Sequence, residues 1–129
     1  MPPSRSNTLT EAELRLMEVL WDRGSSTVQS VLEALPGNPV LAYNSVLTTI
    51  RILEKKGYVK HVKDGRAHVY TPVIERQEAT RSAISLLVQR FFGNSREQLV
   101  LNILEDESIE RGELKRLRQL LNEREGRGE

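Results

Sequence analysis

Three segments in the first half of the chain carry apolar residues at the three- and four-residue spacing of amphipathic helices. Thr10 and Glu13 form a T-x-x-E capping box, hydroxyl residues at 25–27 can cap the second segment, and Gly24 and Gly57 follow the first and third as stop signals. We therefore predict helices over residues 11–23, about 28–35 and 43–56. The apolar residues that support these predictions are Leu14, Met17, Leu20 and Trp21 in the first helix, Val28, Val31, Leu32 and Leu35 in the second, and Val46, Ile50 and Leu53 in the third.

Two short segments after the third helix alternate as strands do. Residues 58–63 and 66–71 are rich in Val and Tyr, and Asp64-Gly65 between them is a strong signal for a two-residue hairpin turn. Three helices and a hairpin make the winged helix-turn-helix arrangement, in which the third helix lies in the DNA major groove and the hairpin, the wing, lies alongside. The expected fold class is mainly α with a small β-hairpin.

The second half of the chain predicts helices only. One helix covers 75–92, Ser95 and Gln98 form a capping box for the next, and Ser108 can cap the last. These helices are short, and a single copy of the chain cannot bury all of their apolar stripes. We therefore expect them to pair with the same helices of a second copy, making a homodimer. The alternative is that they fold back on the winged helix. The residues expected at the dimer interface are Ile84, Leu87, Val88, Phe91, Leu99, Val100, Ile103, Leu104, Leu114, Leu117 and Leu121.

The length of 129 residues suits one domain, or one small domain with an oligomerisation arm, and the predicted elements divide the chain accordingly. We expect a disordered arm at 1–8, a winged-helix DNA-binding domain at 9–74, a helical dimerisation region at 75–125 and a frayed tail at 126–129.

Composition narrows the class of protein. The sequence has no apolar run of about 18 residues and no apolar core near its start, so we expect neither a membrane span nor a signal peptide. The expected location is the cytoplasm, with no direct membrane insertion. The sequence has no cysteine, which excludes disulfides, thiolate nucleophiles and Cys-ligated metal sites.

Positive charge gathers on the third helix and the hairpin. The chain has a net charge of +1, yet residues 43–68 hold six Lys or Arg against two acids. On the third helix a polar stripe lies opposite the apolar one, at about 100° per residue. Its members are Asn44, Thr48, Arg51 and Lys55. Such clustering is typical of a phosphate-binding surface, and the alternative is an ordinary solvated helix face.

The sequence holds no constellation typical of catalysis or of a cofactor site. His61 and His68 fall in the two wing strands and could face each other, but no cysteine or nearby carboxylate cluster offers further metal ligands. The consecutive acids at 105–107 would point in different directions on a helix, so they do not indicate a metal site. We therefore expect no metal, no cofactor and no enzymatic activity.

The chain resembles the penicillinase repressor family, of the BlaI/MecI type, from about residue 9 to residue 123. The segments that carry the resemblance are LTEAELRLMEVLW (9–21), YNSVLTTIRILEKKGYV (43–59), KDGRAHVYTPVI (63–74) and FFGNSREQLVLNIL (91–104). The resemblance implies a dimeric winged-helix repressor that binds a palindromic operator in double-stranded DNA and dimerises through its C-terminal helices. It also implies that the repressor silences resistance or stress genes until a signal removes it.

By position, the resemblance implies three sets of DNA contacts. The set in the major groove is Asn44, Ser45, Thr48 and Arg51. The set near phosphate at the end of the helix is Lys55 and Lys56, and the set flanking the wing tip is Lys63 and Arg66. Ile52 stands where some members carry Arg, so no member's operator can be assigned to this chain.

In the family's antibiotic-sensing members, a membrane sensor metalloprotease cuts the repressor between an Asn and a Phe in the second C-terminal helix. The matching positions here are Asn102 and Ile103, so the Asn is present and the Phe is not. The resemblance thus implies release by proteolysis in response to antibiotic or cell-envelope stress, and the alternative is that Asn102 is an ordinary solvent-side residue. The copper-sensing relatives use a C-terminal cysteine cluster, which this sequence lacks.

A function of a different class would keep the same fold. The winged helix could serve as a protein–protein assembly module without specific DNA readout, with the third helix as the partner surface. Such a module would not need the excess of basic over acidic residues at 43–68.

Overall fold

The computed structural model describes residues 8–35 and 43–127. Most of the expected N-terminal arm, the Pro36-Gly37-Asn38-Pro39 segment and the last two residues lie outside the described part. The elements of the chain are α1 (Glu11–Arg23), β1 (Ser26–Thr27), α2 (Val28–Ala34), α3 (Tyr43–Lys56), β2 (Val59–Asp64), β3 (Ala67–Pro72), α4 (Arg76–Phe91), α5 (Arg96–Leu104) and α6 (Arg111–Arg127). The chain forms two compact units, 1–86 and 87–129, so the first part of α4 belongs to the same unit as the winged helix.

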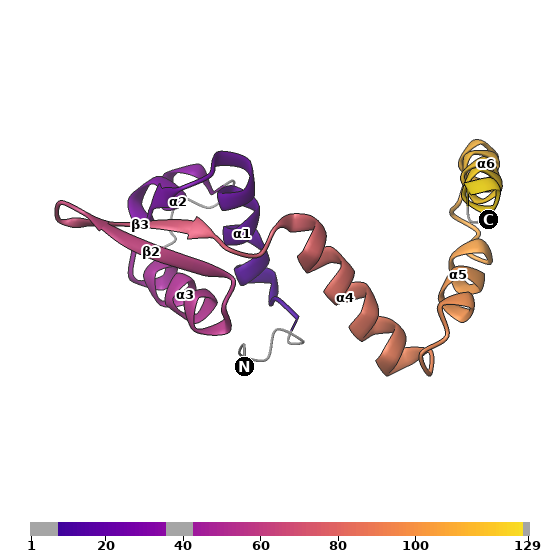
Figure 1. Ribbon diagram of the computed structural model, residues 1–129, viewed down its shortest axis with the longest axis horizontal. Coiled ribbons are helices and arrows are strands. Elements are labelled where there is room, and N and C mark those ends of the chain that lie inside the picture. Colours follow the sequence, from indigo (N-terminus) through magenta and orange to yellow (C-terminus); the bar gives the residue numbers. More distant parts are fainter. Residues whose placement is uncertain (1–7, 36–42, 128–129) are drawn as a thin grey trace. The chain divides into compact units, whose positions relative to one another are not determined.

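The first unit is built around one apolar core. Three helices and a small sheet enclose it, and the β2–β3 hairpin extends beyond the helices (Figure 1). The buried side chains are Leu16, Met17, Val19, Leu20, Val28, Val31, Val46, Ile50, Leu53, Tyr58, Val59, Tyr70 and Ile74. These include the predicted inward positions of α1 and α3 other than Leu14 and Trp21, which are exposed and partly buried respectively.

Local signals in the sequence account for the helix ends. Both hydrogen bonds of the predicted capping box form between Thr10 and Glu13 at the start of α1. The side chain of Thr27 caps α2 by accepting a hydrogen bond from the backbone N–H of Ser30, 3.1 Å away. Gly57 follows α3 with φ +89°, and the next N–H returns to the carbonyl of Leu53, as in a Schellman ending.

The sheet has three strands rather than the two that the sequence predicts. Its order is β1-β3-β2, and both pairings are antiparallel. The hairpin turn is also one residue later than predicted, since Asp64 pairs with Ala67 and leaves Gly65 and Arg66 as the loop. Gly65 has φ +66° and Arg66 does not have positive φ, a pattern that fits a type II′ turn, which favours glycine at its first loop position.

The start of α4 is held to α1 through Trp21. The indole Nε1 donates a hydrogen bond to the carbonyl of Ile74 at 2.8 Å, and the Arg76 guanidinium lies 5.3 Å from the centre of the indole ring. Arg76 also forms an ion pair with Asp22 at 2.9 Å. Trp21 therefore joins α1 to the start of α4.

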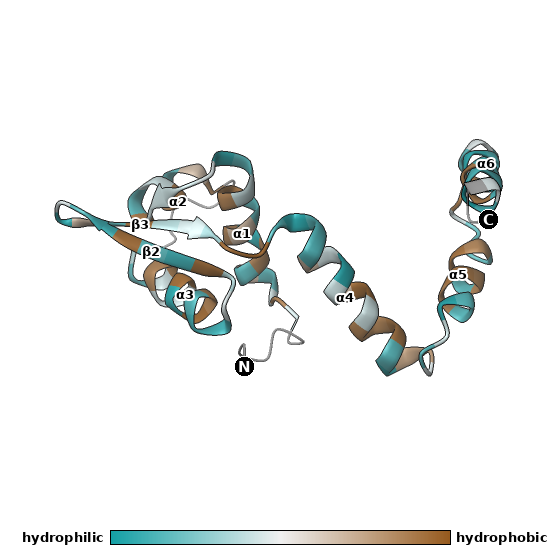
Figure 2. Cartoon of the chain, in the orientation of Figure 1, coloured by the Kyte–Doolittle hydropathy of each residue, from teal (hydrophilic) through white to brown (hydrophobic). Residues whose placement is uncertain are grey.

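The second unit contains the end of α4 together with α5 and α6. Ser95 caps α5 by accepting a hydrogen bond from the N–H of Gln98 at 3.1 Å. The prediction that Ser108 caps the last helix is wrong, because both its N–H and its hydroxyl donate to the carboxylate of Asp106 and α6 begins only at Arg111. Hydrophobic residues recur along α4 and α5 (Figure 2), and none of the α5 residues is buried.

Candidate nucleic-acid interface

Helix α3 has the two opposed faces that its sequence predicts. Val46, Ile50 and Leu53 are buried in the core. The residues that the sequence assigned to the opposite stripe or to the groove are exposed: Asn44, Ser45, Thr48, Arg51 and Lys55. The helix therefore packs on the core with one side and presents a row of hydrogen-bonding groups with the other.

The wing also has two distinct faces, which its strand register defines. Val59, His61 and Lys63 pair with Pro72, Tyr70 and His68, so these six side chains share one face. Val59 and Tyr70 on this face are buried in the core, and Glu54 of α3 reaches His61, so the face is turned toward α3. Lys60 lies on the opposite face of the same strand. Among the wing lysines, Lys63 is thus the one on the α3 side.

A contact between Glu54 and His61 joins α3 to the wing. The Glu54 Oε2 and His61 Nδ1 atoms are 2.6 Å apart. The ring of His61 is stacked on that of His68, with 4.6 Å between centroids and 18° between planes. The prediction that the two histidines face each other is confirmed, although they pair diagonally rather than directly.

A hollow of about 350 Å³ lies where α2, α3 and the wing meet. We call it the wing hollow, and its lining residues are Thr27, Val28, Gln29, Tyr43, Leu47, Arg51, Arg66, Ala67, His68 and Tyr70. Three separate elements contribute its basic side chains, namely Arg51 from α3, Arg66 from the turn and His68 from β3. None of the described residues that line it is an acid.

Tyr70 forms part of the wall of the wing hollow and keeps its proton at neutral pH. Burial raises the pKa of its phenol, and the charge of nearby Glu54 adds to the rise. The guanidinium of Arg51 acts in the opposite direction, both through its charge and through a hydrogen bond, but does not reverse the shift. Tyr70 therefore offers a neutral hydroxyl beside Arg51.

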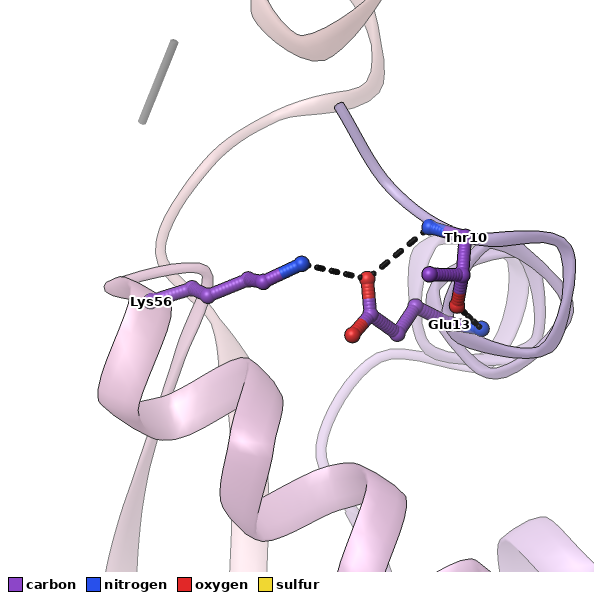
Figure 3. Close-up of polar contacts among 3 residues, drawn as sticks. All are labelled: Thr10, Glu13 and Lys56. Carbon is purple, nitrogen blue, oxygen red and sulfur yellow. Dashed lines mark hydrogen bonds and ion pairs between the residues drawn. The ribbon is translucent and has the colours of Figure 1, made fainter. Parts of the chain in front are cut away.

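Lys56, which the sequence places near phosphate, has a structural partner instead. Its Nζ lies 2.8 Å from Oε1 of Glu13, which also accepts a hydrogen bond from the N–H of Thr10 (Figure 3). Burial alone would raise the pKa of Glu13, but the hydrogen bonds from Lys56 and Thr10 outweigh it and hold the pKa below its ordinary value. Lys56 thus joins α3 to α1, whereas Lys55 remains exposed.

The structure adds side chains that the sequence did not single out. Gln29 and Tyr43 line the wing hollow together with Arg51, and Glu54 orients His61. Ser45 lines a different, smaller hollow beside α1. The exposed position of Gln29 and Tyr43 follows from helical periodicity, but their nearness to the wing depends on tertiary packing.

The residues expected at a dimer interface are mostly accessible within the described chain. Those exposed are Ile84, Leu87, Phe91, Val100, Ile103, Leu104 and Leu121, and those half-buried are Leu99, Leu114 and Leu117. Val88 is different, because it is only 1% exposed in the single chain. It therefore packs within its own chain rather than offering a surface.

The proposed cleavage position lies within a regular helix. Asn102 and Ile103 are both exposed on α5, and the Asn102 Nδ2 donates a hydrogen bond to the carbonyl of Gln98 at 3.0 Å. Proteases prefer exposed and flexible segments, so cutting here requires α5 to open locally.

The described part of the chain contains neither a candidate metal site nor a membrane-spanning helix. Within it, no three His, Cys, Asp or Glu side chains are placed to share a metal ion. None of its helices combines the length and apolar character needed to cross a membrane.

Comparisons with known proteins relate the chain to transcriptional repressors of one family. The family model described as "Penicillinase repressor" matches residues 9–123. The penicillinase repressor of Bacillus licheniformis is 30% identical over 119 residues, which are 92% of this chain and 93% of that protein. The transcriptional regulator BlaI of Mycobacterium tuberculosis is 35% identical over 99 residues, covering 75% of this chain and 72% of the relative.

A solved structure matches the first part of the molecule. It is the solution structure of the DNA-binding domain of the repressor BlaI, with 31% sequence identity and a TM-score of 0.50. The match covers 60% of this chain and 90% of that domain. The winged-helix architecture is thus shared with a domain described as binding DNA.

Proposed function

From the membership of this chain in the penicillinase repressor family, which makes it a transcriptional repressor with a winged-helix DNA-binding domain, we propose that it acts as a homodimer on a palindromic operator. Each copy places α3 in one major groove, and the half-sites lie one helical turn or a small multiple apart. The observation that carries this proposal is that Arg51, from the exposed stripe of α3, lines one basic hollow together with Arg66 and His68 of the wing.

The roles of the DNA-contacting residues follow from their positions. Asn44, Ser45, Thr48 and Arg51 are exposed on α3, where they can contact base edges. Lys63 and Arg66 are exposed on the wing and bind the DNA backbone, while Lys55 extends these phosphate contacts at the end of α3. The alternative, an assembly module without DNA readout, has no comparable support because it leaves this basic surface without a purpose.

Replacing Arg51 with Ala tests the proposal. We expect Arg51→Ala to reduce the preference for the operator over unrelated DNA by about 1–3 kcal/mol, since a side chain bound to a base edge carries specificity. Titration of the full chain with a duplex from upstream of its own gene, and with a scrambled duplex, measures both affinities. An unchanged ratio of the two affinities would remove Arg51 from the base-reading set.

The homodimer is proposed on the exposed apolar side chains of the C-terminal helices. Ile84, Leu87, Phe91 and Leu121 are each between 39% and 74% exposed in the single chain. A stable interface buries about 1,600 Å² in total, and apolar side chains of this kind are suited to it. We leave Val88 out of the interface because it is already buried.

We also propose that the repressor is released by proteolysis between Asn102 and Ile103, by a membrane sensor metalloprotease that responds to antibiotic or cell-envelope stress. The support is the accessibility of both residues on α5 and the family membership of the chain. Because Ile103 lies at one of the apolar positions of the proposed interface, a cut there would weaken dimerisation and hence operator binding.

A further inference from the structure

The wing hollow has a charge pattern suited to an anion. Arg51, Arg66 and His68 reach it from three different elements, and its described lining contains no carboxylate. The exposed Lys63 is the direct cross-strand partner of His68 and adds a fourth basic group on the same face. A phosphodiester brings a single negative charge and accepts several hydrogen bonds, so it matches this lining.

His68 lies among side chains that come from several elements. On β2 it faces Lys63 and the stacked ring of His61, and on β3 it neighbours Tyr70. Arg66 of the turn, and Arg51 and Tyr43 of α3, line the same hollow as His68. The uncharged side chains of Thr27 and Gln29 face the hollow from the start of α2.

His61 occupies a different position, although it touches His68. Its Nδ1 is engaged by Glu54 at 2.6 Å, and it is not one of the residues that line the hollow. The Glu54 carboxylate is thus hydrogen-bonded to His61, and Glu54 is not one of the residues that line the hollow. This difference makes His61 a matched control, because it is a second histidine of the same wing with its own anionic partner.

We propose that the wing hollow binds a phosphodiester of the operator backbone and that His68 contacts it as an imidazolium, so that DNA binding takes up a proton. The inference rests on the proposed DNA-binding function and adds to it a phosphate site and a linked protonation. A protonated imidazole can donate to phosphate with a full positive charge, which a neutral imidazole lacks. Histidine is the side chain that ordinarily gains or loses its charge between about pH 5 and 8, so the effect is tested near neutral pH.

The sign of the pH dependence follows from proton uptake. If each wing binds up to one proton with the DNA, affinity increases as pH falls, by up to about tenfold per bound proton for each pH unit. The phosphate carries no base identity, so an unrelated duplex should show the same uptake, only at lower affinity.

Calorimetric titration of the full chain in two buffers of different ionisation enthalpy measures the protons taken up directly. The probes are a duplex from upstream of its own gene and a scrambled duplex of the same length, at pH 7. We expect uptake with both probes for the wild-type chain and for His61→Gln, and a loss of most of the uptake for His68→Gln. Thermal unfolding of each variant verifies that the fold is retained.

Four outcomes would overturn the inference. Tight binding without proton uptake, or uptake that persists in His68→Gln, would show that His68 does not bind phosphate as an imidazolium. Uptake restricted to the operator duplex would assign His68 to a base edge instead. Failure to bind either duplex would reject the proposed function as well, so the two failures can be told apart.

Discussion

At the scale of single residues, similar side chains in this molecule have different roles because their neighbours differ. Lys55 and Lys56 are adjacent in sequence, yet Lys56 lies 2.8 Å from the carboxylate of Glu13 while Lys55 is exposed. His61 is engaged by Glu54, while His68 lines the wing hollow. Sequence position alone therefore does not separate an exposed cation, which is available to DNA, from a cation with a structural partner.

The Glu13–Lys56 pair gives a prediction about stability. Glu13→Gln should lower the free energy of unfolding by about 1–3 kcal/mol at neutral pH, because it weakens a mostly buried, hydrogen-bonded ion pair. The pKa of Glu13 is lowered from 4.5, so the stabilisation is complete above that value and is lost as pH falls through the lowered pKa of the folded state. Urea unfolding from pH 7 to pH 3 should therefore show the wild type and the variant converging in acid.

Glu11 supplies the control for this experiment. It lies in the same first turn of α1, but its ion pair with Arg15 is 4.0 Å long and both side chains are largely exposed. Glu11→Gln should change the free energy of unfolding by at most about 0.5 kcal/mol. Equal losses from the two substitutions would mean that the contact with Lys56 adds no specific stabilisation.

At the scale of elements, α3 shows how far the sequence could predict the fold. Its bounds, residues 43–56, were predicted as observed, because apolar spacing and a following glycine are local signals. Strand β1 was missed, since the two residues Ser26 and Thr27 carry no pattern and become a strand only by pairing with β3. The prediction that Ser108 caps the last helix was wrong because its N–H and its hydroxyl both donate hydrogen bonds to the nearby Asp106 carboxylate.

The candidate site was only partly predictable for the same reason. The outward stripe of α3 follows from helical periodicity, so Arg51 could be predicted as a site residue from it. Arg66 could be predicted from its place beside the expected hairpin turn. The wing hollow could not be named, because it joins residues as distant in sequence as Gln29 and His68. The strand register that places Lys63, and not Lys60, on the α3 side also depends on which residues form the turn.

Helix α5 gives a prediction about proteolysis. The bond between Asn102 and Ile103 lies inside a helix, and the family's Phe is replaced by Ile. We expect the sensor protease to release a fragment that ends at Asn102, and Ile103→Phe to be cut faster because it restores the aromatic residue. Intact mass spectrometry after incubation with the protease measures both. Cleavage elsewhere, or a rate that does not respond to this substitution, would contradict the assignment.

At the scale of the whole molecule, the account requires two copies, since a palindromic operator matches a two-fold protein. Phe91 is 74% exposed and Leu121 is 57% exposed in the single chain. Introducing Asp at either position should shift the full chain from dimer to monomer at micromolar concentration, because a charge buried in an apolar interface is costly. Sedimentation velocity measures the shift.

Val62→Asp is the control for the dimer experiment. Val62 is also an exposed apolar residue, at 59%, but it lies on the wing face turned away from α3. This variant should sediment as the wild type does. A wild-type chain that sediments as a monomer would contradict the proposed homodimer, whatever the variants do.

The most direct test of the central claim, that α3 and the α3-facing side of the wing form one DNA-binding surface, is the salt dependence of binding to a duplex from upstream of the chain's own gene. With about 6–10 phosphate contacts per dimer, affinity should fall by about 10³–10⁵ between 50 and 200 mM salt. Lys63→Ala should reduce the slope of log affinity against log salt by about one for each wing, while Lys60→Ala, on the opposite face, should leave it unchanged. A shallow wild-type slope, or equal effects from the two lysines, would contradict the account.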